Sequence, residues 1–149
     1  MQIMRRSATS FLAVLCAFVV AGCGEQTDAR VGHWTLDFET IVEQAEQRDG
    51  EPIPEFALAM MKKMQYQIET REDGAFIAIA KRPGREDRVE GTWTATDAGM
   101  VISNVTTNGE PAPDGKGAVI TLIDRDHFML RSDGDDDELY FVRISIAAE

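Results

Sequence analysis

The chain has 149 residues and is acidic, with 15 Lys and Arg against 26 Asp and Glu and a formal net charge of −11. The length fits one domain, and 44% hydrophobic with 28% charged residues is a globular composition, which excludes disordered, collagen-like and coiled-coil proteins. A surface of this charge repels phosphate, and the sequence holds no large Lys/Arg cluster, so we expect no nucleic-acid partner.

Residues 1–22 have the layout of a secretory signal peptide. A pair of arginines gives a positive start, residues 11–20 form an apolar stretch, and two small residues precede Cys23. The apolar stretch is too short to cross a membrane as a helix. We therefore expect residues 1–22 to be removed during secretion.

The segment Val20-Ala21-Gly22-Cys23 resembles the lipobox of bacterial lipoproteins. The resemblance implies cleavage before Cys23 and acylation of that residue, and several acyl chains hold a protein firmly in a membrane. An ordinary secreted protein cut at the same place is the alternative. In lipoproteins of Gram-negative bacteria, Gly24 in place of Asp implies the outer membrane, so the expected location is the cell envelope, anchored by lipid and facing the periplasm.

Lipidation would also leave the mature domain without a free thiol, because Cys16 lies in the signal peptide and the sulfur of Cys23 becomes a thioether. Thiol catalysis, disulfides and Cys-based zinc sites are then excluded, and the fold depends on its hydrophobic core. We expect residues 23–31 to form a lipidated tether and residues 32–147 to form the folded domain.

The domain begins with a short predicted strand over residues 34–38. Helical spacing of apolar residues among Glu and Gln predicts a helix over residues 39–48, which the Asp49-Gly50 pair ends. Two prolines then separate it from a second short helix over residues 55–64. The chain thus places a pair of helices directly after its first strand.

From Met64 onward the apolar period is two, which predicts strands separated by turn signals. An antiparallel meander must protect its edges, and pairing the first strand with the last does so. The predicted fold is mainly β, an antiparallel up-and-down barrel or strongly curved meander of about eight strands, with one or two helices between the first and second. The seven later strands are expected at residues 64–69, 75–81, 89–96, 100–107, 118–123, 127–131 and 139–145.

Gly32-His33-Trp34, at the start of the first strand, resembles the opening of the lipocalin and fatty-acid-binding-protein superfamily, over roughly residues 32–145. Gly91-Thr92-Trp93 is similar to a second such motif in small bacterial lipocalin-like lipoproteins, and the helix pair is similar to a fatty-acid-binding lid. The resemblance implies that Trp34 closes the barrel floor beneath Arg143. The sequence lacks the Thr-Asp-Tyr motif and an Arg/Tyr carboxylate clamp, so no ligand chemistry follows.

Two functions fit this pattern. The first is a non-enzymatic binding module for a small hydrophobic ligand, with soft, flexible side chains over the barrel mouth. The second is a structural or protein-interaction lipoprotein whose barrel is fully packed and which holds an envelope protein by a sheet edge or an acidic hairpin. For the binding module, the predicted lumen residues are Tyr66, Ile68, Phe76, Trp93, Phe128 and Phe141, and the predicted gate residues are Phe56, Met60 and Met64.

Catalytic and metal motifs are absent from the sequence: it has no nucleophile elbow, no His-Glu-x-x-His and no phosphate loop. We expect no enzyme activity, cofactor or metal. The acidic run over residues 133–138 offers the hard oxygens that calcium prefers, but it lacks the spacing of an EF-hand and is typical of a solvated hairpin tip. His33 and His127 each lie beside a turn, where a surface role is the common one.

Overall fold

A computed structural model describes residues 28–145 of the chain. The predicted signal peptide, the lipidation of Cys23 and most of the predicted tether lie outside the described residues. Within residues 28–145, no helix is long and apolar enough to cross a membrane.

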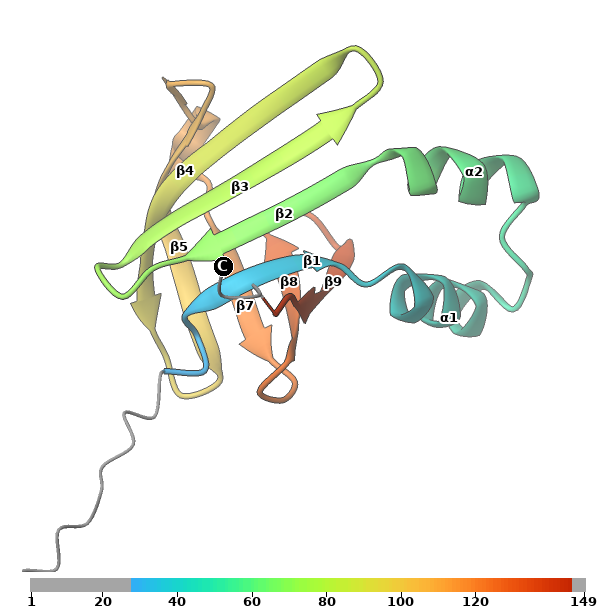
Figure 1. The fold of residues 1–149 in the computed structure, drawn as a ribbon, viewed down its shortest axis with the longest axis horizontal. Coiled ribbons are helices and arrows are strands. Elements are labelled where there is room, and N and C mark those ends of the chain that lie inside the picture. Colours follow the sequence, from blue (N-terminus) through green and yellow to red (C-terminus); the bar gives the residue numbers. More distant parts are fainter. Residues whose placement is uncertain (1–27, 146–149) are drawn as a thin grey trace, which may run out of the picture.

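Strand β1 (Gly32–Leu36) is followed by helix α1 (Phe38–Asp49) and helix α2 (Glu55–Lys63), and the rest of the described chain is an antiparallel meander (Figure 1). The elements of the meander are β2 (Gln65–Thr70), β3 (Ala75–Arg82), β4 (Arg85–Ala95), β5 (Gly99–Thr107), β6 (Glu110–Pro111), the 3-10 helix η1 (Pro113–Gly115), β7 (Ala118–Leu122), β8 (His127–Ser132) and β9 (Glu138–Arg143).

Eight of the strands close into a barrel. β1 pairs with β2 on one side and with β9 on the other, β4 pairs with β5, and β5 pairs with β7, so the ring has no free edge. The short strand β6 pairs only with β5 and is not part of the ring. The predicted fold class, an eight-stranded antiparallel barrel with helices after the first strand, is confirmed.

Several strand boundaries differ from the prediction by one to four residues, and two of the differences have clear local reasons. The first strand ends at Leu36 because Asp37 caps the following helix, with its carboxylate accepting a hydrogen bond from the Thr40 N–H at 3.1 Å. The fourth strand begins at Arg85, four residues before the predicted start, because the β3–β4 hairpin stays in register to the pair Arg82–Arg85 through a charged stretch without apolar alternation.

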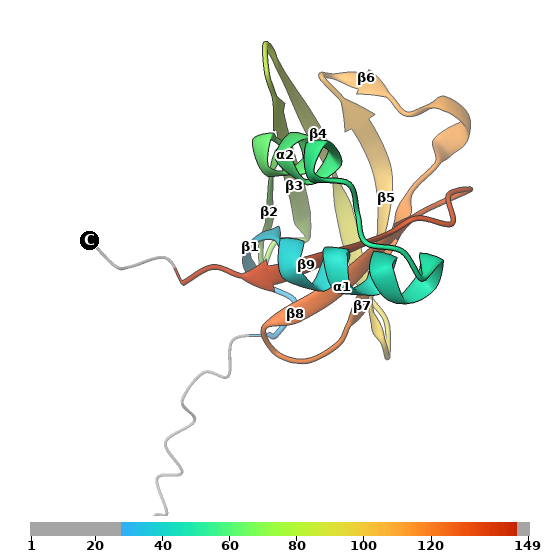
Figure 2. The ribbon, with the colours of Figure 1, turned by 90° about the vertical axis from the view of Figure 1, so that its right-hand side faces the viewer.

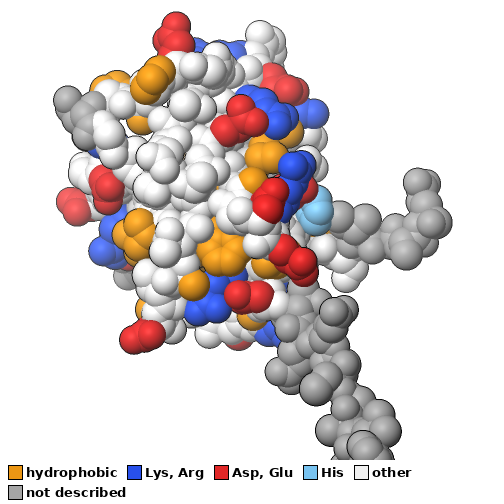
Figure 3. Space-filling model, turned by 90° about the vertical axis from the view of Figure 1, so that its left-hand side faces the viewer, with side chains coloured by type: hydrophobic (Ala, Val, Ile, Leu, Met, Phe, Trp, Pro, Cys, Tyr) orange, Lys and Arg blue, Asp and Glu red, His pale blue; other side chains and the backbone are white. Residues whose placement is uncertain are grey.

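The barrel has two different ends. We call the end that carries α1, α2 and the β3–β4 and β8–β9 hairpins the mouth, and the opposite end the floor. Figure 2 views the barrel from the side of the two helices, which lie in front of the strands. Figure 3 views the opposite side, which shows side chains of both charges around scattered apolar ones.

A cluster of buried aromatic side chains lies toward the floor. Trp34 and Phe128 meet edge to face with ring centroids 4.6 Å apart, and Phe128 stacks on Phe141 at 5.0 Å. All three side chains are fully buried. Aromatic groups bury large apolar areas and prefer these geometries, so this cluster is the main apolar contribution to the stability of the floor.

Gly91, in the second Gly-x-Trp motif, lies where the register of β4 and β5 shifts between Glu90 and Thr92. A β-carbon at Gly91 would lie 2.9 Å from the Ser103 carbonyl oxygen, closer than packed atoms approach. Glycine therefore lets the two backbones come together at this bulge, where the barrel wall bends.

Candidate binding cavity and barrel floor

An apolar cavity of about 210 Å³ occupies the mouth half of the barrel. Its walls come from seven of the eight ring strands, and the polar side-chain groups among them are the hydroxyls of Tyr66 and Ser132. The lining residues are Tyr66, Ile68, Phe76, Ala78, Val89, Ile102, Val105, Gly117, Ala118, Leu130, Ser132, Leu139 and Phe141.

Small and β-branched side chains leave this space unfilled. Val89, Val105 and Leu130 line the cavity yet are only partly buried, although they pack against the core. Because these side chains belong to the inner wall, their exposure means that solvent reaches the cavity from the mouth. The barrel is therefore filled at one end and hollow at the other.

The residues predicted to line a lumen occupy three places. Tyr66, Ile68, Phe76 and Phe141 line the cavity. Phe128 belongs to the buried cluster under it.

Trp93 lies toward the floor end of β4, partly buried, and its indole N–H donates to the Arg71 carbonyl oxygen at 2.8 Å. It does not line the cavity.

The predicted gate residues lie on or next to α2. Phe56 is 72% exposed and Met60 is 65% exposed, and Met64 is partly buried at the C-terminal end of the helix. None of the three lines the cavity. The helix buries no residue, so it lies at the mouth without filling it (Figure 2).

Trp34 and Arg143 are direct register partners between β1 and β9. The guanidinium carbon of Arg143 lies 4.2 Å from the centre of the Trp34 ring, within the range of a cation–π interaction. Arg143 also donates to the carbonyl oxygens of Ala29 at 2.6 Å, Val31 at 2.8 Å and Arg125 at 2.9 Å. The arrangement joins β1, β9 and the segment before β1 through one side chain.

Residues 28–32 cross the floor, and we call this segment the strap. Arg30 in the strap donates to the carbonyl oxygens of Gly99 at 2.7 Å and Thr96 at 2.8 Å, at the β4–β5 turn. The Thr70 hydroxyl accepts from the Trp34 indole N–H at 3.2 Å and donates to the Arg30 carbonyl oxygen. Sequence analysis missed Arg30 and Thr70, because a lone Arg in a polar segment has no pattern that distinguishes it from a tether.

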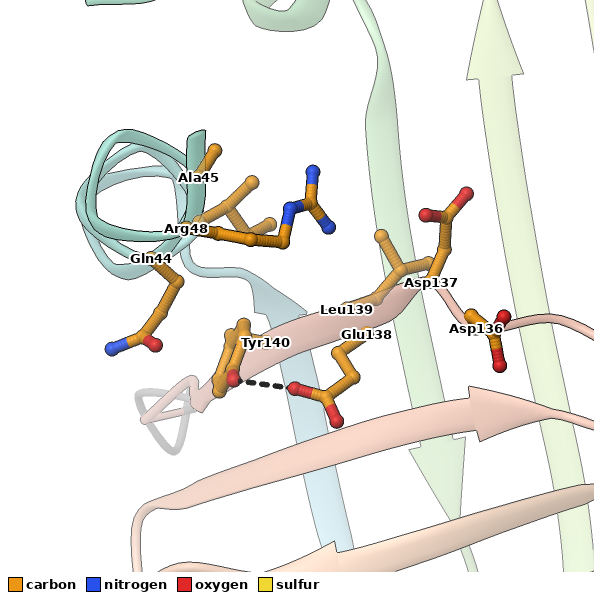
Figure 4. Close-up of a pocket in the computed structure, with 9 residues that line it drawn as sticks. Gln44, Ala45, Arg48, Asp136, Asp137, Glu138, Leu139 and Tyr140 are labelled. Carbon is orange, nitrogen blue, oxygen red and sulfur yellow. Dashed lines mark hydrogen bonds between the residues drawn. The ribbon is translucent and has the colours of Figure 1, made fainter. Parts of the chain in front are cut away.

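A second hollow, of about 500 Å³, lies between α1 and β9 (Figure 4). Its apolar wall is formed by Ile41, Ala45 and Leu139, and Leu139 also lines the barrel cavity. The Tyr140 hydroxyl donates to the Glu138 carboxylate at 2.9 Å, and burial, followed by this bond, raises the pKa of Tyr140. The hollow is thus a groove beside the mouth that shares one wall with the cavity.

The groove carries charges of both signs. Arg48 pairs with Asp49 at 3.0 Å, and the carboxylates of Asp136 and Asp137 stand on the opposite side (Figure 4). These groups are close to water, where ion pairs contribute little.

Hydrogen bonds to the carboxylate of Asp87 fix the mouth end of β4. The Asp87 side chain is 9% exposed and accepts hydrogen bonds from Asn108 at 3.0 Å, Arg82 at 2.8 Å and Arg85 at 2.9 Å. These bonds, that from Asn108 first, lower the pKa of Asp87 from 3.8 to about 2. The β3–β4 hairpin is therefore tied to the end of β5 by a titratable group.

The remaining polar candidates serve the turns. His127 Nδ1 lies 2.8 Å from the Asp124 carboxylate in an exposed turn. In the acidic run, Asp133 accepts from the Gly117 backbone N–H at 3.0 Å and so joins two loops at the mouth. Among residues 28–145, no group of three or more His, Cys, Asp or Glu side chains is placed to hold a metal ion.

Fold and site together define a small antiparallel barrel with a closed floor and an apolar cavity at its mouth. No protein family, no curated protein and no solved structure matches the chain.

Proposed function

We propose that the protein is a lipid-anchored lipoprotein of the bacterial cell envelope, placed in the outer membrane and facing the periplasm, whose lipocalin-like barrel binds a small apolar ligand. The observation that carries this proposal is the apolar cavity of about 210 Å³ in the mouth half of the barrel. A cavity lined by apolar side chains with few polar groups is the common form of a site for an apolar ligand.

The volume sets the size of the ligand. An apolar cavity of about 150 Å³ is enough for benzene, and sites for drug-sized molecules run from roughly 300 to 1,000 Å³. The cavity of about 210 Å³ lies between these values. It suits a single ring, a short alkyl chain or the end of a longer chain whose remainder extends through the mouth.

The chemistry of the lining supports binding rather than catalysis. Among the lining residues there is no carboxylate, imidazole or amine, and Tyr66 carries the single ionisable group. The lining therefore offers no carboxylate or imidazole pair for general acid–base chemistry. The contact between Trp34 and Arg143 supports the lipocalin-like part of the proposal.

A packed barrel that holds an envelope protein is the second candidate. It is favoured by the exposed β8–β9 turn, where Asp135, Asp136 and Asp137 project from the mouth. The cavity argues against it, because a barrel whose only task is structural gains stability by filling such a space.

Filling the cavity tests the proposal. Ala118 lines the cavity, whereas its neighbour Val119 is 42% exposed. We expect Ala118→Phe to abolish binding of 1-octanol, because the new ring occupies the space, and Val119→Phe, the matched control, to retain it. Binding is followed by methyl chemical shifts of Leu130 and Val105 in NMR spectra of the domain from Gly24 onward.

Equal octanol affinity in the two variants would place the ligand elsewhere, and no shift in the unmodified protein at millimolar octanol would count against the binding role. Native mass spectrometry of the same domain, purified from a periplasm without detergent, identifies the natural ligand by its extra mass. Charge reversal across Asp135 to Asp137 tests the second candidate, since it should release a crosslinked envelope partner.

A further inference from the structure

The strap is bonded to the floor on both of its sides. On one side Arg30 reaches the Gly99 and Thr96 carbonyl oxygens, and on the other side Arg143 reaches the Ala29 and Val31 carbonyl oxygens. Hydrogen bonds from a charged group are stronger than neutral ones. The strap is therefore held on both sides by charged donors.

Glycine at position 32 lets the Arg143 guanidinium lie directly over the backbone. A side chain at Gly32 would collide with that guanidinium. The Gly32 N–H also donates to the Thr70 hydroxyl at 3.1 Å. The close approach places the end of the strap against the Trp34 and Arg143 pair at the centre of the floor.

The chain between the strap and the proposed lipid anchor is short. Four residues separate Cys23 from Asp28, so the two are at most about 18 Å apart in a fully extended chain. The wall of the barrel is higher than this: β4, which runs from the mouth to the floor, has eleven residues. At about 3.3 Å per residue and a tilt of about 35–45°, such a strand rises more than 20 Å.

A mouth resting on the anchoring bilayer would lift the floor, and Asp28 with it, by this full height. The chain from Asp28 would then have to pass around the outside of the barrel to reach the membrane, which about 18 Å does not allow. The bonded strap and the short connection therefore exclude an inverted barrel.

We propose that the strap sets the orientation of the barrel, with the floor toward the bilayer that holds the lipid and the mouth toward the aqueous compartment. The inference rests on the proposed lipid anchor. Its consequence is that the cavity opens toward that compartment and exchanges its ligand there, and not with the lipids of the anchoring membrane.

Two exposed turns at opposite ends of the barrel allow a direct test. Asp97 lies in the β4–β5 turn at the floor, and Asp135 lies in the β8–β9 turn at the mouth. Asp97→Cys and Asp135→Cys each place one reactive thiol in the mature lipidated chain, which is labelled with bimane and reconstituted in phosphatidylcholine vesicles containing nitroxide-headgroup lipid. We expect the nitroxide lipid to quench bimane emission at position 97 and to leave the emission at position 135 unchanged.

A longer connection between the anchor and the strap tests whether the strap is what sets the orientation. About ten Gly-Ser residues between Glu25 and Gln26 add up to about 35 Å of reach, and we expect them to bring quenching to position 135. Asymmetry that survives the insertion would assign the orientation to an affinity of the floor for lipid and would overturn the role of the strap. Circular dichroism checks that each labelled variant is folded.

The outcomes distinguish this inference from the function on which it rests. Equal quenching at positions 97 and 135 in the chain without insertion would overturn the orientation while leaving the anchor and the cavity intact. A chain that does not sediment with the vesicles would refute the anchor, and the orientation with it, while octanol binding would still be measurable.

Discussion

The floor and the mouth of this barrel are built from the same eight strands, but they differ in what fills them. At the floor, Trp34, Phe128 and Phe141 pack ring against ring and are fully buried. At the mouth, Ala118 and Val89 face the same interior and leave a cavity. An eight-stranded barrel is just wide enough for its side chains to fill it, so side-chain size at a few inward positions decides between core and pocket.

The two ends also differ in how their backbones are held. At the floor, Arg30 and Arg143 donate to backbone carbonyl oxygens, which do not titrate. At the mouth, the β3–β4 hairpin is held through the Asp87 carboxylate. Asp28 and Asp126 also pair with the two floor arginines, at 3.1 and 3.3 Å, so the floor has both neutral and titratable acceptors. The comparison indicates that acid loosens the mouth more than the floor.

The largest effect is expected from a substitution in the aromatic cluster of the floor. Trp34→Ala removes a fully buried ring and leaves Arg143 without its aromatic surface. We expect a loss of about 3–5 kcal/mol in the free energy of unfolding, the usual cost of deleting a buried aromatic side chain. Urea denaturation followed by circular dichroism measures it.

Trp93→Ala is the matched control, since Trp93 is partly exposed and lies outside the fully buried cluster. The free energy of unfolding should fall clearly less in this variant than in Trp34→Ala. Equal losses in the two variants would show that the floor cluster is not the main source of stability.

A pH titration sharpens the comparison at the mouth. The pKa of Asp87 is lowered from 3.8 to about 2 by its hydrogen bonds, that from Asn108 first. A depressed pKa in the folded state means that the stabilisation is present above pH 3.8 and is lost as the pH falls toward 2. We expect amide hydrogen exchange in residues 82–88 to accelerate over this range, once corrected for the intrinsic rate, while β1 amides stay protected.

Asp87→Asn should remove this transition, because the amide does not titrate. Its hairpin should exchange faster than that of the unmodified chain at pH 5, and the two rates should converge as the pH falls through 2. Simultaneous loss of protection at floor and mouth would contradict the separate stabilisation of the two ends.

The sequence predicts the barrel well because closure depends on alternation and turns, and both are local patterns. It predicts the cavity less well. In β3 and β5 both faces are apolar, so the pattern does not say which residues point inward; Ala78 and Ile102 line the cavity, and sequence analysis missed both. The strap has no periodicity at all, and its role depends on Arg143, which lies more than a hundred residues away.

The smallest effect is expected on α2, which lies at the mouth without filling it. Met60 is 65% exposed and does not line the cavity, so Met60→Glu should change the free energy of unfolding by no more than about 0.5 kcal/mol. Phe38 at the start of α1 packs against the core, and Phe38→Ser should lower the free energy of unfolding more.

Because Met60 does not line the cavity, we also expect the octanol affinity of Met60→Glu to match that of the unmodified chain. A weaker affinity at unchanged stability would show that α2 closes over the bound ligand. The mouth would then be covered by a helix when ligand is bound, whereas the floor is closed by packed side chains at all times.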